Sequence, residues 1–201
     1  MKLYLKPGAC SLSPHIVLRE SGLAFDIAAV DLAAKKLEDG ADFLTVNPKG
    51  QVPTLALDEG GILTEGAAIV QYVADRAPDS GLLPPVGSLE RYRVLEWLNF
   101  VGTELHKTFS PLFRPNTPDA FKDIVKQTLT TKFAVVEAGL AGKDYLTGDR
   151  FTVADAYCFT VLRWAPRVGL PLDGYPNITA YMARVAERPA VAAALVAEGI
   201  A

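Results

Sequence analysis

The start of the chain constrains the fold most, because it predicts a strand, a sharp break and a helix in direct succession. Residues 2–6 alternate polar and apolar side chains with the period of two that is typical of a short strand. Pro7-Gly8 ends that strand. A helix of about three turns follows, with Ser11 or Ser13 as its candidate N-cap and Gly22 beyond its end.

Cys10 lies at, or just before, the N-terminus of this predicted helix. Unpaired backbone N–H groups at a helix N-terminus favour negative charge, and they can lower a thiol pKa from about 8.5 to between roughly 3.5 and 7.5. The alternative is that Cys10 is a small apolar core residue, as free cysteines often are. Position alone leaves both interpretations open, and the short Cys-x-x-Ser spacing to Ser13 does not decide between them.

Composition and charge exclude several classes of partner. The chain has 201 residues, half of them hydrophobic, and a net charge of −3, which suits one large or two small domains with a proper core. Its basic residues are scattered, so we expect neither nucleic acid nor an anionic membrane as a partner. No stretch approaches the roughly 18 apolar residues of a membrane span, and Lys6 and Pro7 interrupt any signal-peptide core. We therefore expect a cytoplasmic protein.

The two cysteines and two histidines predict no cross-link and no metal site. Cys10 and Cys158 are expected to be free thiols, because no secretory signal accompanies them. The four residues have no recognisable metal-ligand spacing.

The next segments predict a small mixed domain. A strand over residues 25–30 follows the first helix, which implies a βαβ unit with parallel strands. A short helix is expected over residues 41–46. Pro53 then stands at the start of an apolar strand, where it must occupy a strand start, an edge or a cis turn. Residues 58–61 are a hairpin signal, and Glu65-Gly66 opens a helix, so that the order is βαβ and then ββα.

A segment rich in proline and glycine divides the chain. We predict a first domain over residues 1–80, a linker over 81–87 and an all-helical domain over 88–201. Ser88 is a plausible cap for a helix running to about residue 107. Further helices are expected over residues 119–140, from the Thr152-x-x-Asp155 capping box through 164, from Pro176, and after Arg188-Pro189.

Polar residues border the apolar seam of the helix after Ser88. Asn99, Thr103 and His106 form a stripe beside Leu98 and Leu105 at helical spacing. Such a stripe can line a cleft, or it can be the edge of a solvated face.

The elements together resemble the glutathione transferase superfamily, and they closely resemble its bacterial beta class. The motifs that carry the resemblance extend over nearly the whole chain, at residues 2–11, 47–53, 63–66, 96–99, 103–107 and 151–157. The resemblance implies an α/β thioredoxin-like N-terminal domain with a cis proline, an all-α C-terminal domain, glutathione as co-substrate and a homodimer.

The resemblance also implies a set of site residues. Cys10 matches the sulfur that the beta class places beside the glutathione thiol, and Cys10 and His106 would stabilise its thiolate. Under the same resemblance, Asn99 or Glu104 would reach across the dimer. The glutathione-binding residues implied are Lys35, Gln51, Val52, Pro53, Glu65, Gly66, Asn99, Thr103, Glu104, His106 and Lys107.

The hypothesis for function is attack of the glutathione thiolate on an electrophilic carbon of a small apolar co-substrate, as in detoxification. The co-substrate would contact Phe109, Leu112, Phe113 and Trp164, although aromatic side chains at helical spacing are often core residues. Two alternatives stay open. A mixed disulfide at Cys10 would give a thiol transferase or peroxidase, and a non-catalytic ligand-binding protein could share the fold.

Overall fold

The computed structural model describes residues 1–201, which form two compact units. Unit 1 comprises residues 1–83 and 188–201, and unit 2 comprises residues 84–187. The first junction lies within the predicted linker, but the assignment of all of residues 88–201 to the helical domain is wrong. The last helix belongs to unit 1 because it packs against the first helix of the chain.

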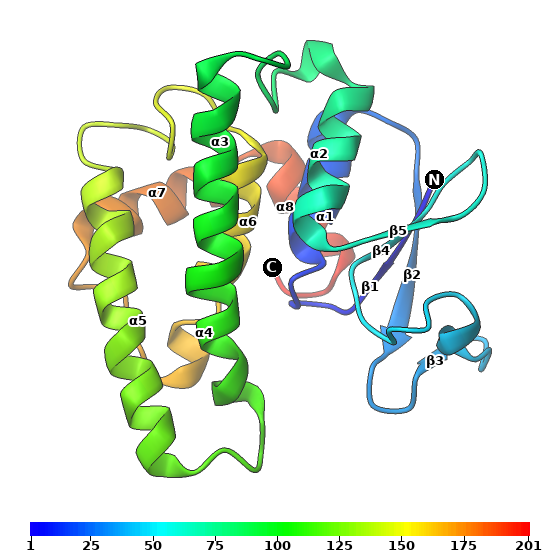
Figure 1. Cartoon of the computed structure of the whole chain (residues 1–201), viewed down its shortest axis with the longest axis horizontal. Coiled ribbons are helices and arrows are strands. Elements are labelled where there is room, and N and C mark those ends of the chain that lie inside the picture. The colour runs from blue at the N-terminus through cyan, green and yellow to red at the C-terminus, as the bar shows by residue number, and fades with distance from the viewer. The chain divides into compact units, whose positions relative to one another are not determined.

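Unit 1 is built on a five-stranded sheet in the order β3-β2-β1-β4-β5 (Figure 1). β1 pairs in parallel with β2, and the remaining neighbours are antiparallel, which confirms the βαβ unit and the hairpin. β3 is an addition that the sequence patterns do not predict. The strands are β1 (Lys2–Leu5), β2 (Asp26–Asp31), β3 (Lys36–Leu37), β4 (Thr54–Ala56) and β5 (Ile62–Thr64).

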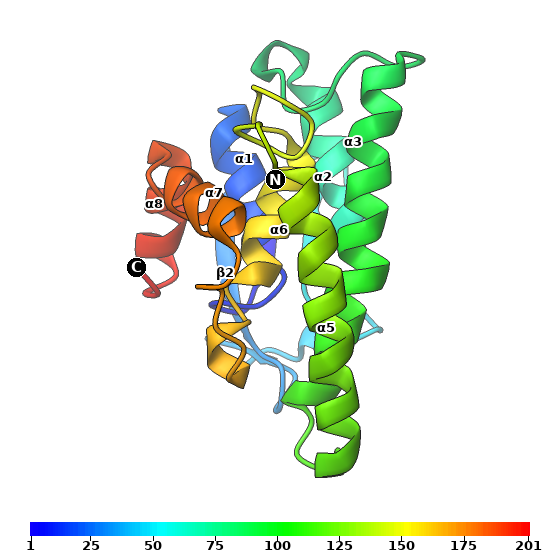
Figure 2. The same cartoon turned by 90° about the vertical axis from the view of Figure 1, so that its left-hand side faces the viewer.

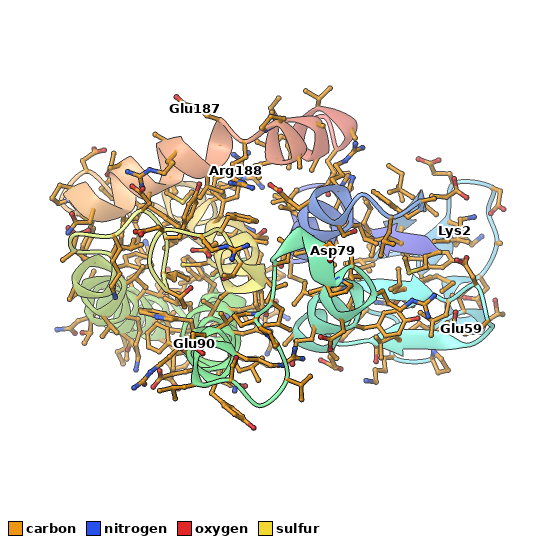
Figure 3. All side chains as sticks on the ribbon, turned by 90° about the horizontal axis from the view of Figure 1, so that it is seen from above. Lys2, Glu59, Asp79, Glu90, Glu187 and Arg188 are labelled. Carbon is orange, nitrogen blue, oxygen red and sulfur yellow. The ribbon has the colours of Figure 1, made fainter.

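Three helices complete unit 1: α1 (Leu12–Ser21), α2 (Gly66–Arg76) and α8 (Pro189–Ala197). α1 packs against both of the others, and Figure 3 shows it between them. The short helix expected over residues 41–46 is a single 3-10 turn, η1 (Phe43–Thr45), and a second such turn, η2 (Pro78–Ser80), follows α2. The core of the unit contains fully buried side chains of the central strands and of α1 and α2, including Leu3, Leu55, Ile16 and Ile69.

Unit 2 is helical (Figure 2). α6 packs against α3 and α7, and α5 packs against α7. The predicted continuous helix from Ser88 to about residue 107 is interrupted by a π-helix, η3. The elements are α3 (Leu89–Phe100), η3 (Val101–His106), α4 (Lys107–Phe109), η4 (Ser110–Phe113), α5 (Asp119–Gly139), α6 (Val153–Leu162), η5 (Pro166–Val168) and α7 (Pro176–Ala186).

α6 is buried along its whole length and begins with the predicted capping box. Thr152 N–H and Oγ1 donate to Asp155 Oδ2 at 2.9 and 2.8 Å, and Leu146 N–H donates to Asp155 Oδ1 at 2.9 Å. The bond from Thr152 N–H pairs the N-cap amide of the helix, and the three bonds together satisfy both carboxylate oxygens of the buried Asp155 without water. None of the helices combines the length and the apolar character needed to span a bilayer.

Candidate functional site

The loop between β1 and α1 holds Cys10 against the segment that precedes β4. The Cys10 thiol donates a hydrogen bond to the Val52 carbonyl oxygen at 3.3 Å, and the Val52-Pro53 peptide bond is cis, as expected. Ser11 does not cap α1 through its side chain. Its Oγ accepts from Lys6 N–H at 3.1 Å and donates to the Lys6 carbonyl at 3.2 Å, which closes the loop on itself.

Burial raises the pKa of Cys10 to about 11, although the backbone N–H groups of Cys10 and Ser11 act to lower it. Of the two interpretations that position leaves open for Cys10, the raised pKa favours a protonated thiol in the protein without a ligand. Desolvation outweighs the helix N-terminus because the thiolate would lose its hydration. A protonated thiol can donate a hydrogen bond, which is the role that Cys10 has toward Val52.

Several backbone donors beside Cys10 have no acceptor within the protein. They are the N–H of Val52 and, at the start of α2, the N–H groups of Gly66 and Ala67. Glu65 precedes the helix with φ of 69°, a left-handed conformation that costs a non-glycine residue about 1–3 kcal/mol and is often found at functional sites. Free amides at a helix N-terminus suit the carboxylate of a ligand.

Three charged side chains lie around these donors. Lys49 Nζ donates to Glu65 Oε1 at 2.8 Å and to Thr64 Oγ1 at 2.9 Å, in a pair whose side chains are both more than half exposed. Lys35 Nζ donates to the Gly50 carbonyl at 2.7 Å. An exposed ion pair stabilises a fold by less than about 1 kcal/mol, so Glu65 can exchange its partner at small cost.

Gln51 contributes to the site through its backbone. Its side chain is exposed, while its carbonyl oxygen accepts from Asn47 Nδ2 and from Thr54 Oγ1, both at 2.9 Å. These two bonds hold the chain immediately before Val52. The structure thus brings the predicted residues from Gln51 to Pro53 together with Cys10.

In unit 2, His106 lies within a group of aromatic side chains. Its Nδ1 is 2.6 Å from the Tyr157 hydroxyl oxygen, and its ring is 5.0 Å from that of Trp164. Burial, with a smaller contribution from the charge of Lys107, lowers the pKa of His106 to about 4. The imidazole is therefore neutral near pH 7 and carries one ring proton.

The other polar residues predicted on this segment are held less tightly. Asn99, Thr103 and Lys107 are exposed, and Thr103 Oγ1 donates to the Asn99 carbonyl at 3.0 Å. The Glu104 carboxylate forms an ion pair with Lys132 at 2.6 Å. Glu104 is thus already paired within unit 2.

The predicted apolar pocket residues divide into core and surface. Phe109 is fully buried and Trp164 nearly so, with their ring centroids 5.7 Å apart. Phe113 packs its ring 5.6 Å from Trp164 and is 50% exposed, and Leu112 is partly buried. Leu112 and Phe113 are therefore the predicted pocket residues with substantial exposed surface, and the buried Phe109 and Trp164 pack beneath Phe113.

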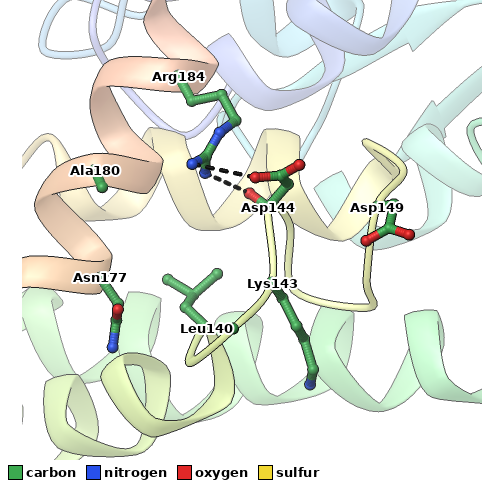
Figure 4. Close-up of a pocket in the computed structure, with 8 residues that line it drawn as sticks. Leu140, Lys143, Asp144, Asp149, Asn177, Ala180 and Arg184 are labelled. Atoms are coloured by element: carbon green, nitrogen blue, oxygen red, sulfur yellow. Dashed lines mark hydrogen bonds and ion pairs between the residues drawn. The ribbon is translucent and has the colours of Figure 1, made fainter.

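Two pockets of unit 2 contain none of the predicted site residues. One of about 290 Å³ has polar walls, where Arg184 donates to the Asp144 carbonyl at 2.9 Å and pairs with its carboxylate at 3.2 Å (Figure 4). The other, of about 570 Å³, lies between the end of α6 and α7. No group of three or more His, Cys, Asp or Glu side chains is placed to hold a metal ion.

Sequence reasoning missed two residues beside the predicted ones. Lys49 lies within the motif over residues 47–53. Its ion pair with Glu65 forms because β4 and β5 are antiparallel, so the segment before β4 and the segment after β5 lie at the same end of the hairpin. Tyr157 stands in the buried α6, and only its distance to His106 distinguishes it from the core residues around it.

The chain matches two family models and closely similar proteins. The models are the N-terminal domain of glutathione S-transferase, over residues 8–76, and its C-terminal domain, over residues 100–189. Glutathione S-transferase GstA of Escherichia coli O157:H7 is 56% identical, with both chains fully covered.

Two solved structures are similar over all of both chains. A sphingomonad glutathione S-transferase complexed with glutathione is 51% identical with a TM-score of 0.96. A bacterial beta-class glutathione S-transferase of Sphingomonas chungbukensis is 50% identical with a TM-score of 0.96.

Proposed function

Because the chain belongs to the glutathione S-transferase family, we propose that it conjugates reduced glutathione to small hydrophobic electrophiles. It is a transferase of the bacterial beta class, and glutathione is its co-substrate.

Unit 1 would bind the backbone of glutathione. The Val52 N–H has no acceptor in the protein and would pair with the peptide of the ligand as a neighbouring strand does. The free N–H groups of Gly66 and Ala67 would receive the γ-glutamyl carboxylate, and Glu65 would take its ammonium group in exchange for Lys49. Lys35 would receive the carboxylate at the glycine end.

Thiol activation would rest on neutral donors. In the unliganded protein the Cys10 thiol is protonated and donates to the Val52 carbonyl, so it can turn its S–H toward the sulfur of glutathione. His106 is neutral as well and can donate from its ring N–H. Two such donors favour the thiolate over the thiol of the ligand, which then attacks the electrophilic carbon.

The electrophile would contact Leu112 and the half-exposed Phe113, whose ring packs against the buried Trp164. Membership of the family also supports a cytoplasmic homodimer. In that dimer Asn99 or Glu104 would reach the glutathione site of the partner subunit. Light scattering after gel filtration measures the dimer directly.

The observation that carries the proposal is the set of unpaired backbone donors, at Val52 and at the start of α2, beside a thiol that already donates. Calorimetric titration of the protein with reduced glutathione tests it. Saturable binding to one site per chain is expected, and absence of binding would refute the proposal.

Cys10→Ala separates conjugation from disulfide chemistry. With chlorodinitrobenzene as electrophile we expect a partial loss of conjugation, because His106 still donates to the thiolate. Unchanged conjugation would remove Cys10 from the mechanism. After incubation with oxidised glutathione, the Cys10 thiol would exchange with the disulfide to give a mixed disulfide and release one reduced glutathione. A mass increase of one glutathione on the wild-type chain, absent in Cys10→Ala, would support a thiol transferase that works in this way.

A further inference from the structure

The contact between His106 and Tyr157 joins two elements that are each held in place. Tyr157 is 7% exposed and lies on α6, which the capping box anchors. His106 ends the π-helix η3, which packs against α6. Gly102 of the same π-helix faces the Tyr157 ring, since a Cβ there would be 3.6 Å from Cε1.

The π-helix turns Gly102 and His106 toward α6. A π-turn accommodates one residue more than an α-turn, and it shifts the side chains that follow by about 100° around the helix. His106 therefore faces Tyr157, with its ring inclined at 85° to that of the tyrosine and at 68° to that of Trp164. The imidazole cannot turn freely between these two rings.

The direction of the hydrogen bond decides which ring nitrogen carries the proton. A neutral imidazole has one N–H and one bare nitrogen, and the partner of one nitrogen sets the state of the other. A phenol O–H is a more acidic donor than a neutral imidazole N–H, so the 2.6 Å contact favours donation from Tyr157 to a bare Nδ1. The ring proton then lies on Nε2.

We propose that Tyr157 is a positioning residue that donates to His106 Nδ1 and so keeps the imidazole proton on Nε2, available to the glutathione thiolate. The last step, donation from Nε2–H to the glutathione thiolate, rests on the proposed function. The position of the ring proton on Nε2 does not depend on it. Tyr157 touches neither the thiol nor the electrophile in this scheme and acts only through His106.

The tautomer can be read in the unliganded protein. Nitrogen-15 NMR of the imidazole groups distinguishes protonated from bare ring nitrogens, and the chain has only two histidines, whose signals His106→Gln assigns. We expect a bare Nδ1 and a protonated Nε2 at His106. In Tyr157→Phe the ratio of the Nε2–H to the Nδ1–H form should fall about five- to tenfold, the equivalent of one hydrogen bond.

Tyr175→Phe is the matched control, because it also removes a tyrosine hydroxyl from unit 2. That hydroxyl donates to the Thr130 carbonyl at 3.3 Å, and the control should leave the His106 signals unchanged. Tyr157→Phe and Tyr175→Phe are first compared by thermal unfolding, so that loss of fold is not mistaken for loss of the tautomer. A protonated Nδ1 in the wild-type protein, or an unchanged ratio in folded Tyr157→Phe, overturns the inference.

A kinetic measurement connects the tautomer to the reaction. In Tyr157→Phe the kcat for conjugation should fall about three- to tenfold with KM for glutathione unchanged, because binding of the ligand backbone is untouched. A normal kcat in Tyr157→Phe would overturn the inference. If the tautomer shifts as expected but glutathione does not bind the wild type, the proposed function fails and the positioning of His106 stands.

Discussion

Gly139 lies directly under the ring of Trp97. A Cβ built on Gly139 would be 2.5 Å from Trp97 Cζ2 and 2.6 Å from Cη2, distances that side-chain atoms do not tolerate. The two residues belong to α5 and α3, so the missing side chain of one helix makes room for the indole of the other. Close packing of this kind leaves no space for even one methyl group.

Gly139→Ala should destabilise the protein by about 1–2 kcal/mol, because an overpacking cost of about 1–3 kcal/mol exceeds the better helix propensity of alanine. Urea unfolding followed by tryptophan fluorescence measures the change. Gly174→Ala is the control, since a Cβ there meets no atom within 4 Å. Equal stabilities for the two variants would contradict the close contact.

Glu198 links the end of the chain to the loop that carries Cys10. Its Oε1 accepts from His15 Nδ1 at 2.8 Å, its Oε2 accepts from Gly8 N–H at 2.9 Å, and Arg19 Nε donates to His15 Nε2 at 2.9 Å. The side chains of His15 and Glu198 are both completely buried. Both ring nitrogens of His15 and both carboxylate oxygens of Glu198 are thus paired within the protein, without water.

Glu198→Gln should lower the free energy of unfolding by about 2–3 kcal/mol, because an amide cannot accept both bonds without turning its NH₂ group toward a donor. We also expect reduced conjugation, since Gly8 stands two residues before Cys10. Glu187→Gln, an exposed glutamate, is the comparison. Denaturant unfolding of both variants checks the prediction, and a loss common to both would mean that the buried contacts contribute nothing.

Glu65→Gln should weaken glutathione binding about tenfold or more, because the proposed bond to the ligand ammonium loses its charge. Calorimetric titration measures the change in Kd. Glu59→Gln removes a carboxylate that contacts Tyr72 and Arg76 in the same unit, and this variant should bind glutathione normally. Wild-type affinity in Glu65→Gln would exclude Glu65 from the ligand site.

The lowered pKa of His106 should make the free energy of unfolding depend on pH. Its pKa is about 4 in the folded protein, because burial disfavours the charged form, and near its ordinary value of about 6.5 in the unfolded chain. Between these two pKa values the unfolded state therefore binds more protons than the folded state. The contribution of the neutral imidazole to the free energy of unfolding is fully present above about pH 6.5 and is lost as the pH falls toward 4.

The stability difference between wild type and His106→Gln should accordingly shrink, or reverse, between about pH 7 and about pH 4.5. Urea unfolding of the pair at several pH values measures it. All other titrating groups are common to both proteins and cancel in the difference. A constant difference across the range would show that the imidazole is not desolvated.

Local signals in the sequence account for most of the fold. The βαβ order, the hairpin before β5, the Thr152 capping box and the helix start at Gly66 each follow from residues a few positions apart. The two-residue strand β3 has no such signal, and the helix expected over residues 41–46 shortens to one turn. These short pieces depend on their neighbours in space.

The candidate site was less predictable because its chemistry depends on burial. Position at a helix start favours a thiolate at Cys10, but desolvation raises the thiol pKa, and no local pattern reports desolvation. The pairing of Tyr157 with His106 joins residues 51 positions apart through a π-helix that the apolar spacing does not reveal.

The return of α8 to α1 determines the order in which the molecule can be completed. α1 is synthesised before unit 2, and one of the helices that pack against it, α8, is made only after unit 2. A nascent chain therefore carries an incomplete unit 1 while unit 2 is being synthesised. Unit 2 is thus an insertion between two segments of unit 1. A fragment of residues 1–83 would lack both α8 and the Glu198 carboxylate that binds Gly8 N–H, so we expect it not to complete the fold of unit 1.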